Sequence, residues 1–168
     1  PIDEKRCDYM AFTLAILKNS NYINCLIANG QAEKDREFCH HDLTHALNVA
    51  RIAYSLWLEA GGNPVAKDIV YSTALLHDIG RSLEYGDQSG ITDHAIESAK
   101  LAHGILEEAG YHPEVIAEIE KAIANHRNPV NEGLSTVLYQ ADKLSRECFL
   151  CPALAKCNRE QKNTKILY

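Results

Sequence analysis

The stretch Leu75-Leu76-His77-Asp78-Ile79-Gly80 decides how the rest of the chain is interpreted, because it places a histidine beside an aspartate at the end of a very apolar helical segment. Burying an ionised aspartate there costs several kcal/mol unless the carboxylate is paired or bound to a cation. A metal ion would satisfy both side chains, and imidazole with carboxylate suits Fe, Mn, Co or Zn. The alternative is a histidine stabilised by the helix dipole, with Asp78 exposed in a loop.

Residues with the same ligand chemistry recur at other positions where an aliphatic side chain would be less costly to bury. His45 lies within an apolar helical stripe, and Asp142 lies in the apolar stretch 139–144. His94 falls in the first turn of an expected helix, and His126 ends a helix whose inner face is aliphatic. The recurrence favours the metal interpretation of the 75–80 segment over the dipole alternative.

Hydrophobic residues repeat at about 3.6-residue intervals along most of the chain and no convincing strand pattern is present, so we expect an all-α domain of six or seven helices. Between helices, residues 81–90 are expected to form a polar loop, and the segment 82–92, with Asp87, is expected to form the rim of the pocket. The tail after Glu147 is expected to be irregular. The expected helices cover about residues 5–18, 20–33, 43–60, 63–80, 92–110, 113–126 and 135–144.

Length and composition favour a small globular enzyme. The chain has 168 residues, 46% hydrophobic and 24% charged, which is typical of one ordinary globular domain. The net charge of −6 argues against a nucleic-acid partner, which needs a basic surface. The sequence contains no apolar run long enough for a membrane span and no signal-peptide pattern at its start. We therefore expect a cytoplasmic protein with reduced thiols and no membrane partner.

The order and context of these residues resemble the HD superfamily of metal-dependent phosphohydrolases. The match rests on His45, the doublet His77-Asp78 followed by Ile79-Gly80, and Asp142, each on its own expected helix. The resemblance covers residues 41–145. It implies an HD-domain helical bundle with a five-helix core, a metal held between helices, and hydrolysis of a phosphoester.

The resemblance narrows to the binuclear, HDIG-type branch of that family. Two further histidines, His94 and His126, stand between the doublet and the last aspartate, and Arg81 stands where mononuclear nucleotidases carry a glutamate. The implied site has His45, His77, Asp78 and Asp142 around one divalent ion, with Asp78, His94 and His126 around a second. Cyclic-dinucleotide phosphodiesterases of the family carry two consecutive histidines where this chain has Asn125-His126. This difference disfavours a cyclic dinucleotide as the substrate.

The implied reaction is attack on a phosphoester, expected to be that of a nucleotide, by a metal-activated bridging water. Asp78 would bridge the ions, and Arg81 would withdraw charge from the phosphoryl oxygens. His41 lies one helical turn before His45 and is expected to point into the same cavity, where it would contact the substrate or add a ligand. A solvent-exposed His41 is the alternative. We expect only structural roles for His40, His103 and His112.

The tail carries a second group of candidate metal ligands, Cys148-x2-Cys151-x5-Cys157, in a chain with six cysteines. Three thiols so closely spaced favour metal binding, with buried inert thiols as the alternative. Cys39 is the expected fourth partner because it immediately precedes the His41–His45 segment. The spacing is similar to the iron–sulfur loops of certain DNA-repair glycosylases, although their upstream cysteine is missing. The expected occupant is a [4Fe–4S] cluster or a zinc ion.

The sequence thus predicts one compact domain: residues 1–40 as N-terminal helices, 41–147 as the HD domain and 148–168 as the cysteine-rich tail. The first functional hypothesis is a phosphohydrolase. The second is an HD-fold regulatory protein that senses metal or redox state with little turnover. A nucleic-acid-processing component, suggested only by the glycosylase-like loop, is disfavoured by the net charge.

Overall fold

The computed structural model describes residues 10–129 and 132–157, and this part of the chain is all-α, as expected. It contains eight α-helices, several short 3-10 turns and no strand within those residues. The α-helices are α1 (Ala11–Lys18), α2 (Ser20–Ala32), α3 (Leu43–Glu59), α4 (Lys67–Leu76), α5 (Arg81–Gly86), α6 (His94–Ala109), α7 (Pro113–Ala124) and α8 (Gly133–Leu144). The 3-10 turns include η2 (Pro64–Ala66), η3 (Cys148–Leu150) and η4 (Leu154–Lys156).

Short polar residues set several helix starts, because their side chains accept hydrogen bonds from backbone N–H groups that a helix leaves unpaired. The Asn63 side chain accepts a hydrogen bond from the N–H of Val65, and the Asp93 side chain accepts one from Ala95. Gly110 ends α6 with a φ of 92°, the left-handed conformation that favours glycine. The expected helices over residues 63–80 and 92–110 have these residues at or near their limits, although the first begins with the 3-10 turn η2 and continues as α4.

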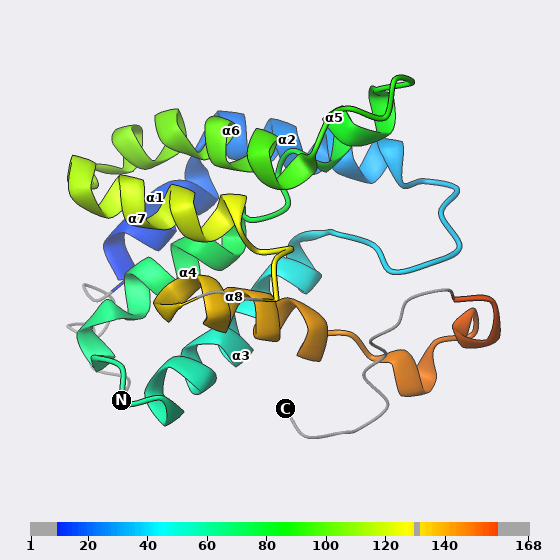
Figure 1. Cartoon of the computed structure of the whole chain (residues 1–168). Helices are drawn as coiled ribbons and strands as arrows, with labels where there is room; N and C mark the ends of the chain where they lie inside the picture. Colours follow the sequence, from blue (N-terminus) through cyan, green and yellow to red (C-terminus); the bar gives the residue numbers. More distant parts are fainter. Residues whose placement is uncertain (1–9, 130–131, 158–168) are drawn as a thin grey trace, which may run out of the picture.

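The helix α4 lies among the other helices of the bundle (Figure 1). It contributes to two apolar clusters, which fixes its position. On one side, Leu75 and Leu76 pack among residues of α1, α2, α6 and α7. On the other side, Val70 and Ala74 pack among residues of α3 and α8. The end of α4, where the His77-Asp78 doublet stands, is therefore held at the centre of the bundle.

The prediction of a polar loop at residues 81–90 is wrong for the first half of that segment, because residues Arg81–Gly86 form α5. The backbone N–H groups of Arg81 and Leu83 donate to the carbonyls of Asp78 and Gly80, so the turn after α4 leads directly into a helix. A tertiary contact adds to these local bonds, because the N–H of Ser82 donates to the Asn29 side chain on α2, and this contact has no local sequence signal.

Other boundaries shift slightly. The helix α8 begins at Gly133, two residues before the expected Ser135, and α1 begins at Ala11, while residues 5–9 lie outside the described part. The predicted domain boundaries remain predictions. None of the helices in the described residues combines the length and hydropathy needed to cross a lipid bilayer.

Candidate metal centre

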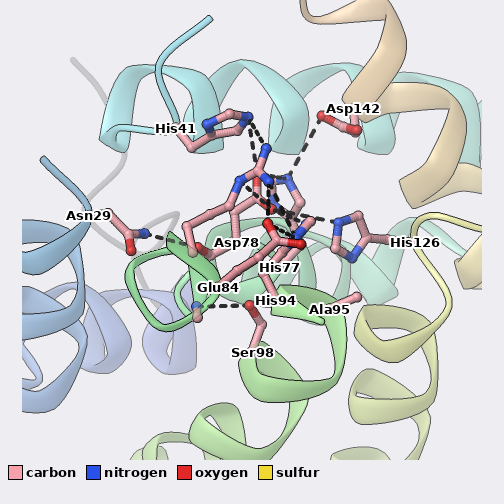
Figure 2. A network of polar contacts seen from close by, with 12 residues as sticks. Asn29, His41, His77, Asp78, Glu84, His94, Ala95, Ser98, His126 and Asp142 are labelled. Carbon is pink, nitrogen blue, oxygen red and sulfur yellow. Dashed lines mark hydrogen bonds and ion pairs between the residues drawn. The ribbon is translucent and has the colours of Figure 1, made fainter. Parts of the chain in front are cut away.

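Asp78 lies where the ends of several helices meet, and its two carboxylate oxygens face different pairs of histidines (Figure 2). Oδ2 is 3.2 Å from Nε2 of His77 and 3.7 Å from Nε2 of His45. Oδ1 is 3.2 Å from Nε2 of His94 and 3.6 Å from Nε2 of His126. One buried carboxylate thus stands between two separate groups of imidazole nitrogens.

The side chains form two groups that could each hold a metal ion. In the first, Oδ1 of Asp142 is 3.4 Å from Nε2 of His45 and 4.0 Å from Nε2 of His77, and Asp78 completes the set. Asp78 also belongs to the second group, with His94 and His126. The six expected ligands come from five elements of the fold, because His77 and Asp78 both lie at the end of α4. The other four lie on α3, at the start of α6, at the end of α7 and on α8.

The donor atoms at the centre suit a metal because several of them have no hydrogen-bond partner. Nε2 of His45, Nε2 of His77 and Oδ1 of Asp78 are buried and without a hydrogen bond in the described residues. Buried polar atoms are normally paired, so such atoms facing one space need an explanation. Imidazole nitrogen and carboxylate oxygen are suitable ligands for first-row transition metals, and the residues present fit such an ion.

The other ring nitrogen of these histidines is held by a neighbouring oxygen. Nδ1 of His77 donates to the carbonyl of Ala74 at 2.7 Å, and Nδ1 of His126 donates to the carbonyl of Ile123 at 2.7 Å. Nδ1 of His94 lies 2.8 Å from the Glu84 carboxylate. Such hydrogen bonds fix the ring orientation and leave Nε2 free to bind a metal.

Both aspartates are held in the ionised form. Burial opposes the charge of Asp78, but the surrounding imidazoles, with the charge of His77 foremost, outweigh it and lower the pKa of Asp78 well below its usual range. Burial likewise opposes the charge of Asp142, while the nearby His45 and the charges of Arg146 and Lys143 lower its pKa. Two ionised carboxylates in one buried site favour a cation between them.

His41 reaches this centre, but from a different element than expected. It precedes α3, whose N-cap is Asp42, so it is not one helical turn from His45. The two rings nevertheless lie 5.4 Å apart, and His41 is buried, which excludes the solvent-exposed alternative. Its Nε2 lies 3.9 Å from Oδ2 of Asp78.

The Glu33 carboxylate and the Arg81 guanidinium hold His41 between them. Nδ1 of His41 is 2.5 Å from Oε1 of Glu33, and Nη2 of Arg81 donates to Nε2 of His41 at 2.6 Å. Burial lowers the pKa of His41 to about 4, so the ring is neutral near neutral pH. Burial opposes the charge of Glu33, but hydrogen bonds from His41 outweigh it and hold the pKa of Glu33 at about 2. Nε of Arg81 in turn lies 3.7 Å from Oδ1 of Asp78.

A cavity of about 230 Å³ opens onto the centre and is lined mainly by charged side chains. The lining residues are Asp78, Arg81, His94, His126, Arg127, Asp142, Lys143 and Arg146. Its four cationic side chains and two carboxylates together carry a charge of 4 − 2 = +2, in a chain whose net charge is −6.

Sequence reasoning missed several residues at the site. Glu33 belongs to an ordinary charged run, and no signal in the sequence shows that it lies against His41. Arg127, Lys143 and Arg146 follow or flank the expected ligands His126 and Asp142, so their proximity along the chain was the available signal. Asp87 lines neither this cavity nor the cysteine cavity described next, and its carboxylate accepts hydrogen bonds within residues 87–92.

The cysteines are brought together only in part. Cys39, Cys148 and Cys151 line a second cavity of about 460 Å³, together with His45 and Arg146, while Cys157 does not line it. All four thiols are free of disulfides. Among the described residues, His103 pairs with Glu120, and neither His103 nor His112 lines either cavity; their structural roles stay a prediction.

Several known proteins are similar to this chain. The family model "HD domain" matches residues 42–147. An "Uncharacterized protein" of Clostridium beijerinckii is 45% identical over 157 residues, which cover 91% of this chain and 96% of that protein. The Bacillus subtilis protein named "Putative phosphohydrolase YueE" is 34% identical over 119 residues, covering 62% of this chain and 66% of that protein.

A crystal structure of a predicted HD superfamily hydrolase from an uncultured Thermotogales bacterium is similar in fold, with a TM-score of 0.53 and 32% sequence identity. The match covers 72% of this chain and 66% of that one. The chain belongs to the HD domain family, as the His77-Asp78 doublet and its partners predicted. HD domains bind divalent metal ions, and the two groups around Asp78 are compatible with that chemistry.

The turn that carries Asp78 is held by two side chains from other helices. The Asn29 side chain donates to the carbonyl of Asp78 at 2.9 Å and accepts from the N–H of Ser82 at 2.8 Å. Gly80 donates its N–H to Oγ of Ser98 at 2.9 Å, and a Cβ on Gly80 would lie 2.7 Å from the Ser98 backbone nitrogen. The turn can approach α6 this closely only with a glycine at position 80.

Asn29→Ala is therefore expected to lower the free energy of unfolding by about 1–3 kcal/mol, because it leaves the N–H of Ser82 unpaired and removes one of the two hydrogen bonds to the Asp78 carbonyl. Asn24→Ala, an exposed position on the same helix, is the control and is expected to change it by less than about 0.5 kcal/mol. Urea denaturation of both variants measures the difference. Equal midpoints for the two variants would contradict the role given to Asn29.

Proposed function

We propose that this chain is a two-metal phosphohydrolase that cleaves a phosphoester of a small molecule, a nucleotide in particular. One ion would be held by His45, His77, Asp78 and Asp142, and the second by Asp78 with the two remaining histidines of the centre. The observation that carries the proposal is the position of Asp78, whose two oxygens each face a separate pair of histidine Nε2 atoms. When bound, the two ions supply Lewis-acid chemistry and lower the pKa of water.

The charge and size of the cavity support an anionic substrate that enters by its phosphate. Its lining carries a charge of 4 − 2 = +2 before any metal is counted. Its volume of about 230 Å³ is smaller than the ~300–1,000 Å³ of pockets that enclose whole drug-sized ligands. The phosphate would therefore lie inside the cavity, and the nucleoside would extend towards solvent.

Arg81 is the residue that we assign to the phosphoryl oxygens. It is buried beside Asp78, and Nη2 of Arg81 donates to His41, which in turn is held by Glu33. A guanidinium fixed in this way presents its remaining N–H groups without having to reorganise as charge develops on the phosphate. His41 accordingly positions Arg81, which refines its expected role as a direct substrate contact.

The names of two similar proteins support the reaction class. YueE carries a phosphohydrolase name, and the similar crystal structure is described as an HD superfamily hydrolase. The nucleotide remains part of the proposal and is supported by the charge of the cavity alone. A regulatory protein with little turnover is the competing function, which the test below separates from the enzyme.

Asp78→Asn tests the reaction. We expect phosphate release to fall on the order of 10³-fold, because the variant keeps the shape of the side chain but loses the charge shared by both ion sites. The assay uses protein supplied with Mn²⁺ or Fe²⁺ and a panel of p-nitrophenyl phosphate, bis-p-nitrophenyl phosphate and common nucleotides. Asp35→Asn, an exposed position, is the control and is expected to keep full activity.

Two results would contradict the proposal. Equal activity of Asp78→Asn and the wild type would remove Asp78 from the reaction. A metal-loaded wild type without turnover on any member of the panel would favour the regulatory function.

Arg127→Gln tests the phosphate-binding cavity at its exposed edge. Its guanidinium lines the cavity and is 52% exposed, so we expect the KM for a phosphoester to rise roughly twofold to fivefold with little change in kcat. Lys100→Gln makes the same change in net charge on α6, outside this cavity, and is the control. Steady-state kinetics in low salt measure both. An identical KM for the two variants would argue against the role of Arg127.

A further inference from the structure

The four cysteines predicted to bind metal lie on two segments that the fold brings together. Cys39 lies between α2 and α3, and the other three lie in the tail after α8. The thiols of Cys39, Cys148 and Cys151 line one cavity, although more than 100 residues separate Cys39 from the tail. Nζ of Lys156 lies 2.6 Å from the carboxylate of Glu37, so the residue before Cys157 contacts the segment that carries Cys39.

Two nitrogens of a buried cation beside these thiols lack hydrogen-bond partners in the described residues. Arg146 is only 5% exposed, and its Nε and Nη1 have no hydrogen bond in the described part of the chain. Burial opposes its charge, but the Asp142 carboxylate and the Cys39 thiol beside it raise the pKa of Arg146. A permanent positive charge at this position would offset part of the negative charge of a metal centre held by thiolates.

We propose that Cys39, Cys148, Cys151 and Cys157 bind a metal centre through four thiolates, separate from the centre at Asp78. Four thiolate charges exceed the two positive charges of a zinc ion or of an oxidised cluster core, so such a centre is a net anion. The unpaired N–H groups of Arg146 lie where they can donate to this anion. This contact supplies the partners that the guanidinium otherwise lacks.

The sulfur atoms are not gathered as tightly as a single zinc ion requires. Among residues 10–129 and 132–157, no three of these sulfurs lie within 4.8 Å of one another. Zinc–sulfur bonds of about 2.3 Å in a tetrahedron would place the sulfurs only about 3.8 Å apart. A [4Fe–4S] cluster holds each thiolate on a separate iron and spreads them further apart, so it is the occupant that we expect.

The same arginine connects this site to the one at Asp78. Nη2 of Arg146 donates to Oδ1 of Asp142 at 2.7 Å, and Arg146 lines both cavities. His45 lines the cysteine cavity and also belongs to the first group of candidate ligands around Asp78. An occupied cysteine site would therefore hold the tail, Arg146 and Asp142 in one fixed arrangement.

The test measures iron, acid-labile sulfide and zinc in protein purified without oxygen, with Cys39→Ala, Cys148→Ala and Cys25→Ala compared with the wild type. Cys25 packs against the apolar core away from the cavity and is the matched control. We expect about four irons and four sulfides that are lost in Cys39→Ala and Cys148→Ala and retained in Cys25→Ala. One zinc lost from the same two variants would support the four-thiolate site with zinc as its occupant.

Metal content that is the same in all three variants and in the wild type would overturn the proposal. Circular dichroism and the retention of ions at the Asp78 centre show whether a variant has folded. His77→Ala separates the two proposals, because it removes a ligand proposed for the Asp78 centre and is expected to leave the cysteine-bound iron or zinc in place.

Discussion

The burial of one ionised carboxylate, that of Asp78, is the constraint on which the rest of the structure depends. The residue is 7% exposed and ionised, and a carboxylate in that position is costly unless cationic or hydrogen-bonding partners surround it. Here the partners are four imidazoles that arrive from four different elements. The bundle brings the ends of several helices together at this point. One oxygen of the Asp78 carboxylate faces His45 and His77, and the other faces His94 and His126.

The packing of α4 explains how that geometry is kept. The helix is buried between two apolar clusters, so the doublet at its end cannot shift without disturbing both. Asn29 and Ser98 then hold the turn that follows through hydrogen bonds to its backbone. The adjoining segments, with Glu33, His41 and Arg81, are attached to this turn by charged hydrogen bonds, which are stronger than neutral ones.

Much of this arrangement could be predicted because its signals are local. Asn63, Asp93 and Gly110 mark helix boundaries by their own backbone chemistry, and the His77-Asp78 doublet is conspicuous in an apolar segment. The short helix at Arg81–Gly86 could not be predicted, since its first turns bond to the preceding turn and to a side chain of α2.

The contacts around His41 could not be predicted from the sequence for the same reason. Its pairing with Glu33 depends on the path of the chain between α2 and α3, and its contact with Arg81 joins residues 40 positions apart. Helical spacing placed His41 near His45 for the wrong reason, because the residue precedes the helix. The cysteine tail stays a prediction: its spacing is visible in the sequence, but its occupant depends on how far apart the fold holds the thiols.

The most direct test of the two-ion centre is anomalous diffraction from crystals of protein purified without oxygen, recorded at the absorption edges of iron, manganese and zinc. The account predicts two separate peaks on opposite sides of the Asp78 carboxylate. One would lie among His45, His77 and Asp142, and the other between His94 and His126. A single peak, or none, in crystals grown with excess metal would contradict it.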